Sequence, residues 1–192
     1  LVFDELTIKG VATQNDVALD QINARLYGGT ASGKMAINWK QGLRVEGNLA
    51  LSRLELKELA ALLSPGTRVG GKLDARPVFS ASAATADQIA KTLRLQTSFN
   101  IQNGVLHGVD IQKAATSLIK QGSTGGETRF EHLSGHLLVE HGSHHFTELK
   151  IVSGAMAADG RVSVSPKKEL SGRINAQVKA VAFSKASGVL TL

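Results

Sequence analysis

Apolar and polar residues alternate along most of the chain, and this period of two limits the folds it can adopt. The longest run places an apolar or small residue at every second position from Leu170 to Ala180. Successive side chains of a β-strand point to opposite faces, so such a run predicts a strand with one dry and one wet face. Similar runs occupy 45–51, 133–139, 146–155 and 162–164. We therefore expect a mainly β fold built on a long, curved antiparallel sheet of amphipathic strands, forming a taco-like groove or an open sandwich.

Turn signals separate these runs. Asn103-Gly104 and Asp159-Gly160 supply residues that tolerate positive φ, so they predict tight hairpins. The segments 141–143 and 165–169 predict slightly longer turns. Consecutive strands should then lie side by side in a meander.

Three short helices are expected between the strands. Ser52 and Glu55 have the spacing of a capping box and predict a helix that ends before Pro65. A second helix is predicted from Thr85 to about Leu93, and a third begins at Asp110 with an apolar face.

The length of 192 residues favours a single unit over residues 1–192. The Gly-rich segment 121–127 predicts a flexible loop and the best internal sub-boundary. The chain begins and ends inside an alternating pattern, so we expect it to be a fragment of a longer protein. Hydrophobic residues make up 42% and charged residues 20%, which is a globular composition.

Charge and composition exclude several classes of function. The formal net charge is +6, but the basic residues are scattered, and aromatic residues account for only 4% of the chain. A nucleic-acid interface usually needs a basic stripe with stacking platforms, so we expect no nucleic-acid partner. The absence of cysteine excludes disulfides, thiolate metal sites and cysteine nucleophiles.

The segment from Gly28 to Lys34 matches the GxxxxGK pattern of a phosphate-binding loop. That loop needs Ser or Thr after the lysine and a helix to follow it. Met35 follows here, and the next residues read as a strand. The segment therefore predicts a Gly-rich hairpin.

Five histidines cluster in the sequence, but their spacing does not make them converge. His132 and His136 share a strand face roughly 13 Å apart at about 3.3 Å per residue. We interpret the cluster as wet-face histidines, with a pH-sensitive edge as the functional alternative, and we expect no metal and no cofactor. The members are His132, His136, His141, His144 and His145.

Candidate catalytic groups are absent from the sequence pattern. No serine lies in a GxSxG elbow, and Asp4 and Glu5 would point to opposite faces of an extended chain. Glu127 and Glu131 flank the start of a strand and suggest no paired carboxylates. We therefore expect a protein that is not an enzyme.

Several local phrases, in order, carry a resemblance to a known family. Leu26–Gly33 resembles the "YGG…G" turn, Phe99–Ile111 resembles "F-x-I-x-[DN]-G-V-L-x-G-[IV]-D-[IL]", and Thr128–Gly135 resembles "T-x-F-x-x-L-x-G". The strands at Leu149–Ser153 and Ala158–Val162 follow in the same order. Over residues 17–180 the chain resembles AsmA-like proteins, which are similar to bridge-like lipid transfer proteins.

The resemblance implies the C-terminal region of a Gram-negative envelope protein. The full-length protein would be anchored in the inner membrane, with this region in the periplasm. Such proteins are thought to conduct phospholipid toward the outer membrane through a long β-groove and are linked to outer-membrane biogenesis.

The amphipathic strands are compatible with that role, because a dry sheet face must be covered by protein or by a ligand. Phospholipid acyl chains, the remainder of the same polypeptide and other envelope proteins are the expected partners. A periplasmic scaffold that pairs through its sheet edges, and a structural module without a ligand, remain alternatives. The residues expected to line a lipid groove are Leu133, Leu137, Val139, Leu149, Ile151, Val162, Val164, Ile174 and Val178.

Overall fold

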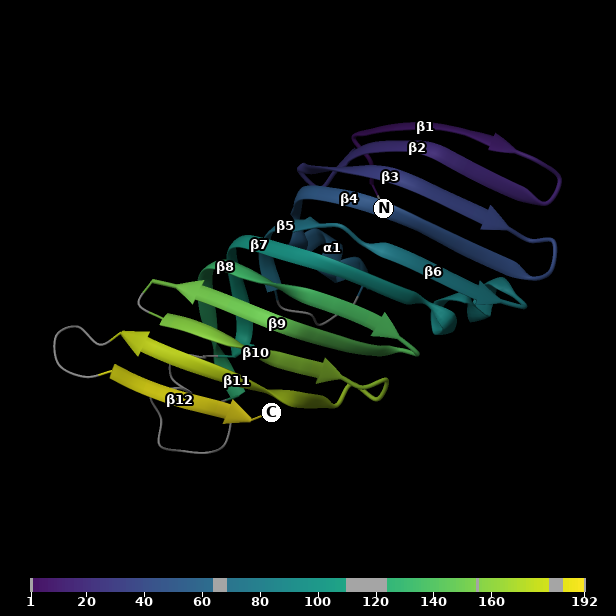
Figure 1. Ribbon diagram of the computed structural model, residues 1–192. Helices are drawn as coiled ribbons and strands as arrows, with labels where there is room; N and C mark the ends of the chain where they lie inside the picture. The colour runs from purple at the N-terminus through teal and green to yellow at the C-terminus, as the bar shows by residue number, and fades with distance from the viewer. Residues whose placement is uncertain (1, 64–68, 110–123, 155, 180–184, 192) are drawn as a thin grey trace.

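The computed structural model describes residues 2–63, 69–109, 124–154, 156–179 and 185–191. Within them, twelve strands form one antiparallel sheet, joined by an α-helix and a 3-10 helix (Figure 1). The expected fold class, a long antiparallel sheet with short helices, is confirmed. The elements are β1 (Glu5–Ala12), β2 (Asp16–Leu26), β3 (Gly29–Asn38), β4 (Leu43–Glu55), α1 (Leu56–Leu63), β5 (Val69–Ala75), β6 (Val78–Ala83), η1 (Ala86–Thr92), β7 (Arg94–Val109), β8 (Thr124–Glu140), β9 (Ser143–Ser153), β10 (Met156–Val164), β11 (Leu170–Lys179) and β12 (Lys185–Thr191).

The strand order follows the chain. Neighbours in the sheet run from β1 to β5, then β7 to β12, while β6 pairs with both β4 and β7. β5 and β6 therefore share the space between two longer strands. The predicted meander is confirmed, and β1 and β12 form the two edges of the described sheet.

Strand register aligns apolar residues of successive strands into rows that cross the sheet. Residues paired across an antiparallel ladder lie on the same face. One such row, which we call the outer row, crosses ten strands, and at about 4.8 Å per strand its nine steps span about 43 Å. Its members are Gly10, Leu19, Met35, Gly47, Phe79, Leu95, Val139, His144, Val164 and Leu170.

Two tight turns use consecutive residues of positive φ. Tyr27 and Gly28 (φ 48° and 68°) join β2 to β3, and His141 and Gly142 (φ 49° and 74°) join β8 to β9. Such pairs match the twist of the flanking strands. The Gly-rich hairpin and the turn at 141–143 are therefore confirmed. So is the turn at 165–169, where the amide of Ser165 donates to the carbonyl of Glu169 at 2.9 Å.

The hairpins predicted at Asn103-Gly104 and Asp159-Gly160 are wrong, because both pairs lie inside long strands. Asn103 has a φ of 50° and interrupts the alternation of β7. A Cβ on Gly104 would overlap the phenyl ring of Phe130, so glycine allows β7 and β8 to approach there. In Figure 1 these ends of β7 and β8 turn down behind β9, β10 and β11.

The first predicted helix begins later than its capping box implied. Ser52 and Glu55 belong to β4, and the helix starts at Leu56. Asp74 explains the difference, because its carboxylate accepts the Ser52 hydroxyl at 3.3 Å and the Arg53 amide at 3.0 Å. These bonds hold β4 extended through the bulge at Arg53, whose φ is 56°.

The other predicted elements have mixed outcomes. The second helix forms as the 3-10 helix η1, and Thr85 makes no side-chain capping bond there. The third helix, from Asp110, lies outside the described residues. In the segment 121–127 predicted to be a loop, residues 124–127 instead begin β8, and residues 121–123 are outside the described part.

The hydrophobic core lies on the apolar face, toward one end of the strands. It joins residues from both halves of the sheet, such as Leu26, Leu54 and Ile151. Leu56 and Leu59 of α1 pack against it, and Phe130, 4% exposed, enters it from the bent part of β8. The helix and this bent hairpin therefore cover part of the apolar face.

Candidate functional site

The apolar face becomes more accessible from one end of the strands to the other. An inner row on β7 to β11 consists of Ile101, Leu133, Ile151, Ala158 and Ala176, which are 4–8% exposed. Toward the opposite strand ends, a middle row is half-buried throughout. Its members are Thr97, Leu137, Phe146, Val162 and Gly172.

The outer row lies beyond the middle row and ends in an exposed residue. Leu170 is 60% exposed, and most other members are half-buried. We call the middle and outer rows together the open strip. The half-buried and exposed apolar side chains of these two rows, interrupted by the buried Val139 and the polar His144, form an extended surface that another apolar group can cover.

The nine predicted lining residues share one face of the sheet by register, and they divide into two groups. Five are buried: Leu133, Val139, Leu149, Ile151 and Ile174. The remaining four are half-buried: Leu137, Val162, Val164 and Val178. Their role in lining a lipid groove stays a prediction, and the accessible group is the part that can meet a ligand without displacing protein.

Sequence reasoning missed the N-terminal half of the open strip. Leu19, Met35 and Phe79 continue the outer row from β2 to β6. The alternation in β3 was obscured by Gly33, and β6 is only six residues long. Register with β4, whose alternation is clear, is the signal that assigns these residues to the same face.

A pair of aromatic rings joins the middle row to the covered part of the face. The rings of Phe99 and Phe146 meet edge to face with centroids 6.2 Å apart. Gly135 lies on β8 between them, and a Cβ there would come within 3.3 Å of Phe99 Cζ. The missing side chain therefore leaves space for the two rings to meet across β8.

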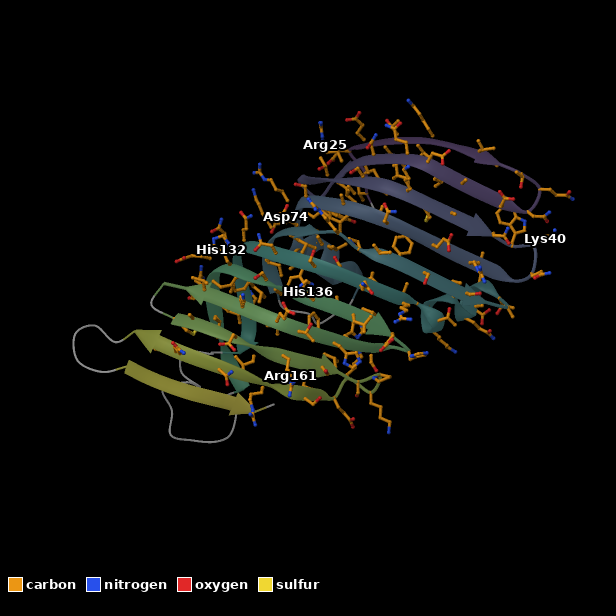
Figure 2. The ribbon with its side chains drawn as sticks, in the orientation of Figure 1. Arg25, Lys40, Asp74, His132, His136 and Arg161 are labelled. Atoms are coloured by element: carbon orange, nitrogen blue, oxygen red, sulfur yellow. The ribbon has the colours of Figure 1, made fainter. Side chains whose placement is uncertain are left out.

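The opposite face is polar. Figure 2 labels Arg25, Asp74, His132, His136 and Arg161, which lie on it. Ion pairs there are exposed, as between Arg25 Nη2 and Glu5 Oε2 at 3.9 Å. Because these side chains are exposed, the polar face is a solvated surface. Exposed pairs of this kind contribute little stability.

The histidine cluster is divided between the two faces. His132, His136 and His145 are on the polar face, where His145 Nδ1 lies 3.0 Å from the Ser163 hydroxyl. His144 is on the apolar face by its pairing with Val139 and Val164, so the expectation of wet-face histidines is wrong for this residue. Among the described residues, no three His, Asp or Glu side chains could hold a metal ion together.

Shallow hollows occur on the polar face. One of about 490 Å³ includes Lys34, Glu46, Asn48, Ser80 and Arg94 among its lining residues. Lys34, the lysine of the GxxxxGK match, is thus on a strand beside a carboxylate-bearing neighbour. The mixture of charges gives this hollow no single preference for an anion or a cation.

The fold defines the class of protein. It is a β-sheet protein with one continuous apolar face, which is covered at one end of the strands and open at the other. The chain belongs to the AsmA family, whose family model matches residues 1–149. That match runs from β1 into β9 and indicates an envelope-associated protein.

Comparisons with the curated proteins and with the solved structures give no match. None of the helices in the described part of the chain has the length and apolar character needed to cross a bilayer.

Proposed function

We propose that this chain is a non-enzymatic segment of a periplasmic protein that carries phospholipid acyl chains on its open strip. The full-length protein would be anchored in the inner membrane of a Gram-negative cell. It would serve phospholipid transport between the inner and outer membranes, and so outer-membrane biogenesis. The observation that carries the proposal is the outer row, which crosses ten strands with nine apolar or glycine positions.

The energetics of burial support an acyl chain as the occupant. Each methylene moved from water onto such a surface gains about 0.8 kcal/mol. The row runs across the strands, so a chain lying along it meets an apolar side chain or a glycine at nine of the ten strands. Positions of similar energy allow a bound chain to move along the strip without a large barrier at any one strand.

Lipid retention tests the proposal. The purified chain is incubated with phospholipid vesicles, re-isolated and examined by native mass spectrometry. We expect bound phospholipid on the unmodified chain and its loss in Leu137→Lys and Val162→Lys, which place a charge in the half-buried middle row. Substitution of Ile151 is a poor test, because this side chain is 4% exposed and its replacement by lysine would unfold the protein.

His136→Lys is the matched control, since it lies on the polar face next to Leu137. It should retain lipid. Unmodified protein that stays lipid-free after incubation contradicts the proposal.

A second candidate function rests on the edge strand β1. All eight of its residues are exposed, including Leu6 at 46%, Ile8 at 49% and Val11 at 62%. An exposed apolar edge strand is a template for pairing with another strand. The chain would then act as a scaffold that joins another envelope protein, or another part of the same polypeptide, through its sheet edge.

The two functions respond differently to the same substitution. Thr7→Pro removes a backbone donor from β1 and should abolish edge pairing, which sedimentation of the chain with its partner would detect. Lipid retention on the open strip should persist. Loss of lipid in Thr7→Pro with no change in Leu137→Lys would favour the scaffold.

A further inference from the structure

His144 is the one polar side chain in the outer row. Register places it between Val139 of β8 and Val164 of β10, two positions from Phe146 on its own strand. The residue is half-buried, and no hydrogen bond or ion pair joins its imidazole to any residue that the structure describes. A polar group on an apolar surface without a protein partner is costly unless a ligand or water satisfies it.

The strands packed against His144 bring no charge to this face. β8 contributes Leu137 and Val139, and β10 contributes Val162 and Val164. An imidazole with apolar neighbours on both sides has no carboxylate on its own face to compete with an incoming anion.

The charged groups near His144 are in two adjacent turns, the one at 141–142 between β8 and β9 and the one at 165–169 between β10 and β11. These turns lie close together, because a Cβ on Gly142 would lie 3.6 Å from Pro166 Cβ. Lys167 and Lys168 in the second turn form no ion pair within the described part of the chain.

The acidic groups at these turns have partners of their own. Glu140 lies 4.0 Å from Arg94, and Glu169 accepts the Ser165 hydroxyl at 3.4 Å. The end of the sheet beside His144 therefore combines an apolar surface with two basic groups that form no ion pair with a described carboxylate.

We propose that His144 binds the anionic headgroup of a lipid whose acyl chain lies on the open strip, with Lys167 and Lys168 adding positive potential. This inference rests on the proposed function and assigns a headgroup position within it. The carboxylate or phosphate oxygen accepts a hydrogen bond from the imidazole, and Phe146 and Val162 contact the first methylenes.

Two ligands with the same chain and different heads separate headgroup from tail binding. Hexadecanoate and hexadecanol are titrated against the full chain below the concentration at which each ligand aggregates or separates from water, using displacement of a fluorescent aliphatic probe. We expect the unmodified protein to prefer the acid roughly tenfold, as one charge-assisted hydrogen bond implies. The His144→Leu variant should lose most of this preference, because it keeps the apolar contacts and only the potential of the two lysines remains.

His145→Leu is the matched control, since this histidine is on the polar face of the same strand. It should keep the preference for the acid. His144→Phe retains a planar ring and provides a second variant if His144→Leu does not fold.

Equal binding of the two ligands by the unmodified protein would overturn the headgroup position and leave the proposed function standing. An undiminished preference for the acid in both His144 variants would also overturn the headgroup position and leave the proposed function standing. Binding of neither ligand by the unmodified protein would overturn the proposed function itself.

Discussion

Phe99 of β7 and Phe146 of β9 meet edge to face across the intervening strand, with ring centroids 6.2 Å apart. The contact is possible because β8 carries Gly135 between them. It marks the boundary on the apolar face between the part covered by protein and the part left open. The packing at this boundary determines how much apolar surface a ligand can reach.

Substitution of Gly135 by alanine should disturb that boundary. The new Cβ would lie 3.0 Å from both Leu149 Cδ2 and the Thr147 carbonyl oxygen. Overpacking of this kind costs about 1–3 kcal/mol of unfolding free energy. Urea denaturation followed by circular dichroism measures the change.

Gly70→Ala provides the control for a generic glycine effect. A Cβ there would meet only Val105 Cγ1, at 3.5 Å, which is ordinary contact. We expect a change within about 0.5 kcal/mol or a small stabilisation. Equal destabilisation by the two substitutions would contradict the proposed role of Gly135.

Asp74 should be more important to stability than a surface carboxylate usually is. It accepts the Ser52 hydroxyl, the Arg53 amide and, at 3.4 Å, the amide of Gln102. Asp74→Ala leaves the backbone donor at the Arg53 bulge unpaired and should cost about 1–3 kcal/mol. Thermal denaturation provides the measurement.

Asp74→Asn keeps an acceptor oxygen and should recover most of the loss. If asparagine and alanine at position 74 prove equally destabilising, the bond to the Arg53 amide is not what holds the end of β4.

The N-terminal half of the open strip should bind the same ligand as the C-terminal half. Met35 is half-buried in the outer row, so Met35→Asn places an amide where an acyl chain would lie. Loss of two or three methylene contacts at about 0.8 kcal/mol each should weaken hexadecanol binding by more than tenfold. Displacement of the aliphatic probe reports the affinity.

Ala36→Asn is the adjacent control, because Ala36 pairs with Ala18 and Glu46 on the polar face. It should leave binding unchanged. Unchanged binding in Met35→Asn would restrict the acyl site to β7–β11.

The amphipathic strands could be predicted because their signal is local. Alternation at 133–139 places Leu133 and Leu137 on one face wherever the strand lies in the sheet. Residues typical of turns were less informative. Asn103 has a positive φ, but it bends strand β7 and does not form a hairpin turn. The start of α1 could not be predicted locally. The hydroxyl of Ser52, the residue predicted to cap the helix, donates its hydrogen bond to Asp74, which is 22 residues further along the chain.

The division of the apolar face could not be predicted from alternation. Ile151 and Val162 are both β-branched residues that follow a basic residue in an alternating strand, yet one is buried and the other half-buried. Ile151 belongs to the buried cluster with Phe130 of the bent part of β8, whereas Val162 packs only against the outside of that cluster. Coverage of a sheet is a tertiary property, whereas strand polarity is a local one.

Site-specific photo-crosslinking tests the central claim most directly. A photoreactive amino acid is placed at Leu137 or Val162 on the open strip, or at His136 or Arg161 on the polar face. The protein is then irradiated with radiolabelled phospholipid. We expect labelled protein from the first two positions and none from the other two. Equal labelling from both faces, or none from Leu137 and Val162, would contradict the account.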